Sequence, residues 1–192
     1  MKFFFILALF VFISICILSF LPNSYLKNPL FWFDNEDKNL TNSERIVNKI
    51  LYEASTSIEK KYNLKPIGTG ISMPGGVVKN LSLAFDPRQR FSKDQLRELT
   101  IQFSTELLNQ INSNEEIQPS LVKRPFTIEN VEIVIYNHDK QGYSIYDPEI
   151  AVAHLDHGII DYKTNDPENE FKYKNRHKET YEEALQLTHN KN

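Results

Sequence analysis

The sequence predicts an α+β domain that follows an N-terminal membrane segment. Three observations carry this prediction. The chain begins with a long uncharged apolar stretch. Apolar residues at helical spacing then recur behind helix-capping signals, and short runs elsewhere alternate apolar with polar residues, as strands do. The inferred order α-β-α-β-β-β-α separates helices from hairpin-linked strands, which favours a mostly antiparallel sheet with helices on one face.

The leading stretch, residues 1–21, is predicted to be a transmembrane signal-anchor. Lys2 is followed by nineteen residues without charge, Phe3 to Leu21. As a helix they would span roughly 28 Å, close to the hydrocarbon thickness of a bilayer. A cleaved secretory signal would have a shorter apolar stretch and a small-residue exit, which Leu18–Pro22 does not provide. A lipoprotein signal would have a small residue before Cys16, where Ile15 stands.

Charge around this segment predicts its orientation. Lys2 precedes the apolar stretch, and an acidic patch that includes Asp34 and Asp37 follows it. Positive residues favour the cytoplasmic side, so we expect a cytoplasmic N-terminus and an extracytoplasmic domain. Residues 22–40 are expected to form a juxtamembrane tether. Its aromatic cluster, Leu30–Phe33, would either lie in the headgroup zone or pack on the domain.

The domain is expected to occupy residues 41–192, a length that suffices for one hydrophobic core. Capping boxes mark the start of three helices. They are Thr41-x-x-Glu44, Ser92-x-x-Gln95 and Thr180-x-x-Glu183. The apolar spacing behind them predicts helices over about 42–61, from Ser92 to about Ile111, and through Leu187.

Strands are expected between these helices. The alternating runs Leu81–Phe85 and Val131–Tyr136 are the clearest. Residues 143–146, 150–155 and 159–163 are expected to supply one or two more, with 138–142 as a hairpin loop and 164–167 as a turn. The glycine-rich residues 68–76 are expected to form a connector.

Composition excludes several functions. Without Lys2 the chain keeps 21 basic and 25 acidic residues, a balance that argues against nucleic-acid binding. The single cysteine, Cys16, lies in the apolar stretch, so the domain has neither a disulfide framework nor a thiolate metal site. We expect no cofactor.

The sharpest candidate for chemistry is the stretch Val152-Ala-His154-Leu-Asp156-His157. It resembles part of the His-x-His-x-Asp-His metal motif of the metallo-β-lactamase fold, with Val152 in place of the first histidine. Only 35 residues remain for further ligands. In a strand His154 and His157 would face opposite sides, so they could share a metal only if a turn intervened. Side chains at a strand end, bonded to solvent or backbone, are the simpler interpretation.

Two other patterns have structural explanations. The first is Gly70-Ile-Ser72-Met-Pro-Gly75, which is similar to the Gly-x-Ser-x-Gly nucleophile elbow. It does not match that motif, because Pro74 stands where the second glycine is required and a strand, not a helix, follows. Phe171–Lys178 interleaves aromatic and basic residues, which predicts a solvated edge strand that leads into the last helix. Contact of this stretch with anionic lipid headgroups is the alternative.

Four segments carry a resemblance to a protein family. They are Met73–Lys79, Leu81–Phe85, Tyr162–Pro167 and Glu179–Leu185. These segments resemble an uncharacterised family of small membrane-anchored proteins of chlamydia-like intracellular bacteria. The resemblance implies a location in the cell envelope and supplies no catalytic residues.

Three functional hypotheses follow. The first is a single-pass membrane protein whose domain faces outward as a binding or structural module with a protein partner. The second is an envelope hydrolase or metal-binding protein that uses His154, Asp156 and His157. The third is a cleaved, secreted protein. Since no complete catalytic motif is present, the sequence favours the first.

Overall fold

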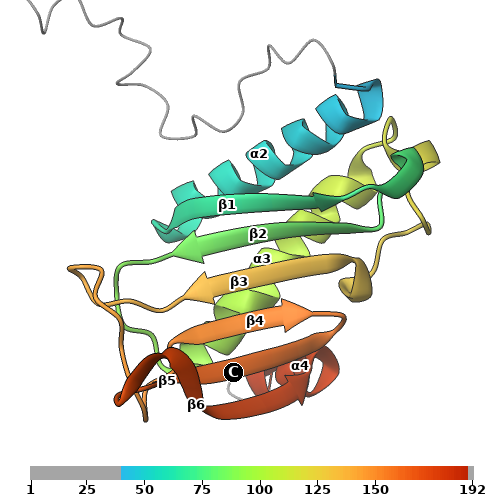
Figure 1. Ribbon diagram of the computed structural model, residues 1–192. Helices are drawn as coiled ribbons and strands as arrows, with labels where there is room; N and C mark the ends of the chain where they lie inside the picture. The colour runs from blue at the N-terminus through green and yellow to red at the C-terminus, as the bar shows by residue number, and fades with distance from the viewer. Residues whose placement is uncertain (1–39, 190–192) are drawn as a thin grey trace, which may run out of the picture. The chain divides into compact units, whose positions relative to one another are not determined.

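The computed structural model describes residues 40–189. The expected membrane segment, residues 1–21, and the tether up to residue 39 lie outside this range. Between residues 40 and 189 no helix is both long and apolar enough to cross a bilayer. The described part contains three α-helices and six strands, in the order α2, β1, β2, α3, β3, β4, β5, β6, α4 (Figure 1). The predicted α+β class is confirmed.

Each helix begins where a capping box predicts it. Helices α2 (Asn42–Tyr62), α3 (Lys93–Ser113) and α4 (Tyr181–His189) follow Thr41, Ser92 and Thr180. At the first two starts the cap hydroxyl accepts the backbone N–H three residues later, and that residue's side chain accepts the cap's own N–H. Thr180 and Glu183 make the same reciprocal pair. The caps thereby satisfy N–H groups that the first turn leaves without partners.

The six strands form one mixed sheet in sequence order, from β1 to β6. Only β2 and β3 are parallel, because α3 connects them, and the other neighbouring pairs are antiparallel. The strands are β1 (Lys65–Ser72), β2 (Asn80–Asp86), β3 (Val131–Tyr136), β4 (Val152–Asp156), β5 (Ile159–Asp166) and β6 (Asn169–Thr180). The expected edge strand at Phe171–Lys178 is confirmed as part of β6.

Three expectations were wrong. Much of the glycine-rich connector is strand β1, in which Gly70 pairs with Ser82 of β2 and a Cβ at Gly70 would require the Ser82 hydroxyl to rotate away. Residues 143–146 form no strand, because only Ser144 bridges back, to His138. The expected turn at 164–167 begins later, at Pro167, since Thr164 is buried and still belongs to β5.

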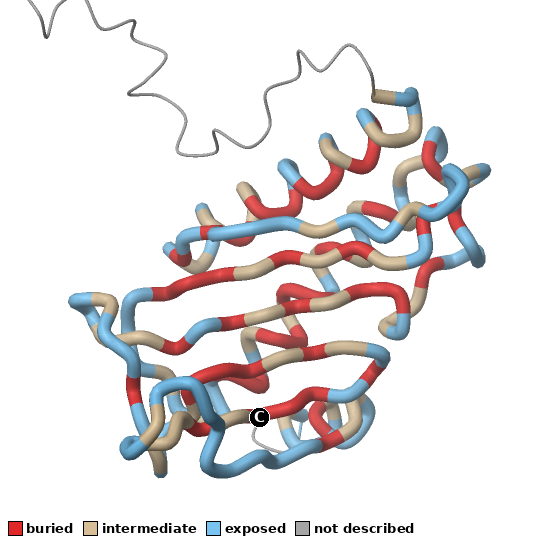
Figure 2. Tube along the Cα trace, in the orientation of Figure 1, coloured by how far each residue is buried: buried red, intermediate tan, exposed pale blue. Residues whose placement is uncertain are grey.

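The core lies between the helices and one face of the sheet. Phe85 of β2 packs on Phe103 of α3, with ring centroids 4.7 Å apart. In β3, Ile133 and Ile135 are fully buried, whereas the alternate residues are partly or fully exposed. Figure 1 shows α3 behind the strands and no described helix in front of them. We call the uncovered side the open face, and Figure 2 shows the buried residues alternating with more exposed ones along its strands.

Candidate functional site

A belt of titratable side chains crosses the open face from β3 to β6. His154 Nε2 of β4 lies 2.7 Å from the Glu132 carboxylate of β3. On the next strand Asp161 is the cross-strand neighbour of His154. Arg176 of β6 donates to the Asp161 carboxylate from both Nε and Nη2, and this bonding raises the pKa of Arg176. We call Glu132, His154, Asp161 and Arg176 the open-face belt. Each of its carboxylates already has a partner that can carry positive charge.

A groove of about 890 Å³ lies at the end of the open face beside the β4–β5 turn. Its lining is mostly polar, and Val122 is its one apolar lining residue among the described residues. The polar lining includes Ser72, Lys79, Asn80, Glu129, Glu132 and Asp156. Through Glu132 the groove adjoins the open-face belt. An open groove of this kind can accept a side chain or loop of another molecule.

The structure separates His154 from Asp156 and His157, the other two residues of the candidate metal motif. His157 lies in the two-residue turn between β4 and β5, with φ 47°, followed by Gly158 at φ 73°. Its Nδ1 lies 2.7 Å from Asp156 Oδ1, and this hydrogen bond raises the pKa of His157. His154 instead pairs with Glu132.

A turn therefore does intervene, and it leaves two separate imidazole–carboxylate pairs. Among residues 40–189 no group of three or more His, Cys, Asp or Glu side chains is placed to hold a metal ion. Two imidazoles that each orient on their own carboxylate do not converge on a shared ion or substrate atom.

A second polar cluster joins the loops that follow the parallel strands β2 and β3. One oxygen of the Asp86 carboxylate, a side chain only 7% exposed, forms an ion pair with Arg88 Nε at 2.8 Å. The other oxygen lies 3.1 Å from His138 Nδ1. Arg88 adopts a left-handed φ of 52°, and His138 stacks on Tyr136 with an interplanar angle of 9°. Asp86 thus fastens one loop to the other.

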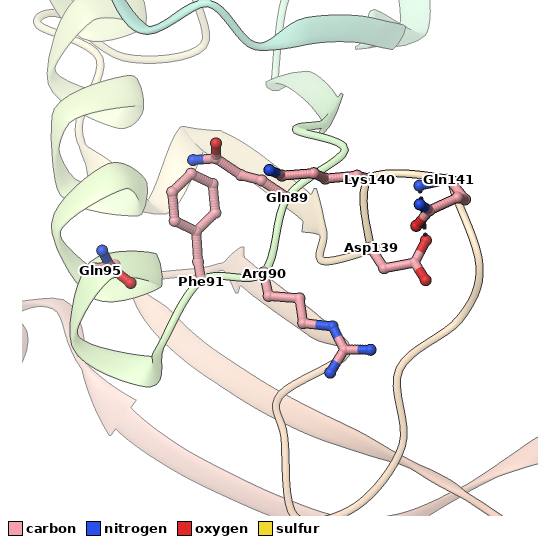
Figure 3. A pocket seen from close by; sticks show the side chains of 7 residues that line it. All are labelled: Gln89, Arg90, Phe91, Gln95, Asp139, Lys140 and Gln141. Carbon is pink, nitrogen blue, oxygen red and sulfur yellow. Dashed lines mark hydrogen bonds between the residues drawn. The ribbon is translucent and has the colours of Figure 1, made fainter.

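The same two loops border a smaller pocket of about 540 Å³ beside the start of α3. Figure 3 shows Arg90, Phe91 and Gln95 on one side and Asp139, Lys140 and Gln141 on the other. Arg90 is already paired with Glu149, at 3.0 Å. Asp139 accepts the backbone N–H of Gln141. The pocket thus combines both signs of charge, and the part of its lining that belongs to residues 40–189 includes no histidine, serine or cysteine.

A third cluster lies buried between α3 and the sheet. Arg97 of α3 donates to both oxygens of Glu179 of β6, at 2.6 and 3.0 Å. The Tyr162 hydroxyl of β5 donates to the same carboxylate at 2.6 Å. Burial alone would raise the pKa of Glu179, but these hydrogen bonds outweigh it and lower that pKa. The hydrogen bond to Glu179 raises the pKa of Arg97, so the pair stays ionised. Its position indicates a structural role.

Of these residues the sequence analysis weighed His154, Asp156 and His157 as candidate ligands, and it placed Ser72 and Arg176 within two other patterns. Glu132 and Asp161 had a usable signal, since each is a charged residue that interrupts an apolar strand and therefore marks its outward side. No local sequence pattern marks Asp86, Arg97 or His138, because their partners are distant in sequence. No protein-family model, no curated protein and no solved structure matches this chain. The resemblance stated above stays a prediction.

Proposed function

We propose that this protein is a single-pass membrane-anchored binding module of the cell envelope whose open face contacts a protein partner. The observation that carries the proposal is the open face itself. Within residues 40–189 it is a broad sheet surface without a covering helix, and it bears a groove and the open-face belt of paired polar side chains. Paired charges of this kind can exchange partners with a complementary protein surface and confer specificity.

The arrangement of the histidines supports binding over catalysis. A hydrolase would need a nucleophile or metal-bound water within reach of a positioned base. In both His154 and His157, one ring nitrogen is paired with a neighbouring carboxylate. The two pairs lie on different elements. The hydrolase hypothesis predicts stoichiometric metal in the purified protein and its loss on His154→Ala, and the binding proposal predicts neither.

Membrane attachment rests on the sequence of residues 1–21. An uncharged stretch of this length and one preceding lysine support an anchor with the domain on the extracytoplasmic side. The secreted alternative differs from this proposal only in membrane attachment, because cleavage would release the same domain from the membrane. Both forms would present the open face to a partner outside the cytoplasm.

Site-specific photo-crosslinking tests the open face. A benzophenone amino acid at Val122, in the groove, is compared with one at Leu187 on α4, because both side chains are 46% exposed. In native membranes we expect a discrete adduct of higher mass from Val122 and none from Leu187. Equal adducts from both positions, or none from Val122, would contradict the proposal.

A further inference from the structure

We propose that β6 is an acceptor edge to which an acidic, extended segment of another protein adds as a seventh strand. This goes beyond the open-face proposal, because strand addition uses the backbone at the edge of the sheet. β6 is the last strand of the sheet and has β5 as its only strand partner among the described residues. One side of its backbone is therefore available for new ladder hydrogen bonds.

The two sheet edges differ in how well they accept a strand. β1 contains Pro66, which has no N–H to donate, and its pairing register shifts between Pro66 and Gly68. β6 has no proline, and its residues Asn175–Thr180 pair with β5 without a register shift. Six regular residues match the usual length of a strand. Along this stretch only Glu179 is buried, whereas the preceding part of β6 is exposed (Figure 2).

The charge of β6 points to the chemistry of the partner. Residues 172–178 contain Lys172, Lys174, Arg176 and Lys178 and no acidic residue. Lys174 reaches Asp147 at 3.8 Å and Arg176 is bonded to Asp161. Lys172 and Lys178 form no ion pair within residues 40–189, and both are exposed. An incoming strand with alternating carboxylates would pair with these cations.

In the registers centred on residues 176–178, the same charges disfavour a second copy of this chain as the occupant. An antiparallel pairing of two β6 strands about His177 would place Arg176 opposite Lys178. A pairing centred on Arg176 or on Lys178 would place that cation opposite itself. Like charges directly opposite one another destabilise a strand pair, so β6 resists self-association while it favours an acidic strand.

Peptide binding to the full-length protein in nonionic detergent tests this inference. The probe is a fluorescent decapeptide of alternating glutamate and threonine, followed by fluorescence anisotropy. We expect saturable binding that weakens as salt is added, and no binding of the matched lysine–threonine peptide. Lys172→Glu/Lys178→Glu should weaken binding by about tenfold or more. Lys49→Glu/Lys60→Glu, an equal charge change on exposed positions of α2, should leave it unchanged.

Backbone methylation separates strand addition from simple charge attraction. Two further peptides carry N-methyl groups either on every glutamate or on every threonine. Because alternate amides of an added strand face β6, one series should lose binding and the other keep it. The inference would be overturned if both methylated series bound or if neither did. It would also be overturned if the parent peptide did not bind, or if the Lys172/Lys178 variant bound it unchanged. The crosslink at Val122 would be unaffected by any of these results.

Discussion

At the scale of single residues, the Arg97–Glu179 pair is the most consequential contact. Both side chains are nearly inaccessible, at 7% and 6% exposure. A buried ion pair adds little to stability compared with apolar packing, but the loss of Glu179 would leave the buried Arg97 with the more exposed Asp94 as its remaining ion-pair partner within residues 40–189. The pair also connects α3 to the end of β6, so it ties the strand that we propose as an acceptor edge to the core.

Glu179→Gln should therefore lower the free energy of unfolding by about 3 kcal/mol. Urea unfolding of the full-length protein in detergent, followed by far-ultraviolet circular dichroism, measures the change. Glu168→Gln, in the exposed β5–β6 turn, is the matched control and should change stability by less than about 0.5 kcal/mol. Equal effects of the two substitutions would show that the buried pair contributes nothing.

The pH dependence of stability follows from the lowered pKa of Glu179. Its contribution is complete above the ordinary glutamate pKa of 4.5 and is lost as the pH falls through the lower folded pKa, because the unfolded chain takes up the proton first. Wild-type stability should therefore decrease more steeply than that of Glu179→Gln below about pH 4.5. Parallel unfolding curves over that range would contradict this assignment.

At the scale of elements, the two-residue turn between β4 and β5 determines where the residues of the candidate metal motif lie. Both of its central residues have positive φ, which a right-twisted hairpin requires. Glycine adopts this conformation without strain, whereas a histidine does so at some cost. The turn places His157 at the groove and leaves His154 on the strand, where it reaches Glu132.

Gly158→Ala should destabilise the protein by about 1–2 kcal/mol, because alanine is strained at positive φ. The new Cβ would not clash with a neighbour, because the nearest atom is a methyl carbon of Ile128 at 3.6 Å. Gly68→Ala is the control, with its nearest neighbour 4.0 Å away. The unfolding midpoints of the two variants in urea should differ clearly, and a Gly158→Ala midpoint equal to that of Gly68→Ala would refute the argument.

At the scale of the whole molecule, the domain is a one-sided sheet with helices behind it, and the binding function that we propose would depend on attachment to a membrane. A binding module at a membrane encounters partners at high effective concentration, whereas a released domain does not. The length and charge pattern of residues 1–21 support an anchor that is not removed.

Intact-mass measurement and carbonate extraction test the anchor. We expect a membrane-bound species with the full mass of 22.5 kDa. The double substitution Phe12→Arg/Ile13→Arg should release the protein from the membrane fraction, because each arginine at the centre of a spanning helix costs about 2.5–3.5 kcal/mol. A soluble wild-type species that starts near Pro22 would instead establish cleavage and secretion.

The sequence by itself determined the features that depend on neighbours along the chain. Capping boxes join residues three positions apart, and apolar periodicity needs only one helical turn or two strand residues. The three helix starts, the strands at Val131–Tyr136 and Leu81–Phe85, and the solvated edge strand could accordingly be predicted. The α+β class followed from their order.

Only the tertiary structure decided the contacts between distant residues. Arg97 and Glu179 are 82 positions apart, and Asp86 and His138 are 52 apart. Strand β1 escaped prediction because its glycine-rich sequence lacks apolar alternation, and its pairing with β2 is a contact that no local pattern reveals. The partner of His154 likewise depends on the register of β3 against β4. Register is set when the hydrophobic faces of all strands pack together, so it cannot be obtained from one strand alone.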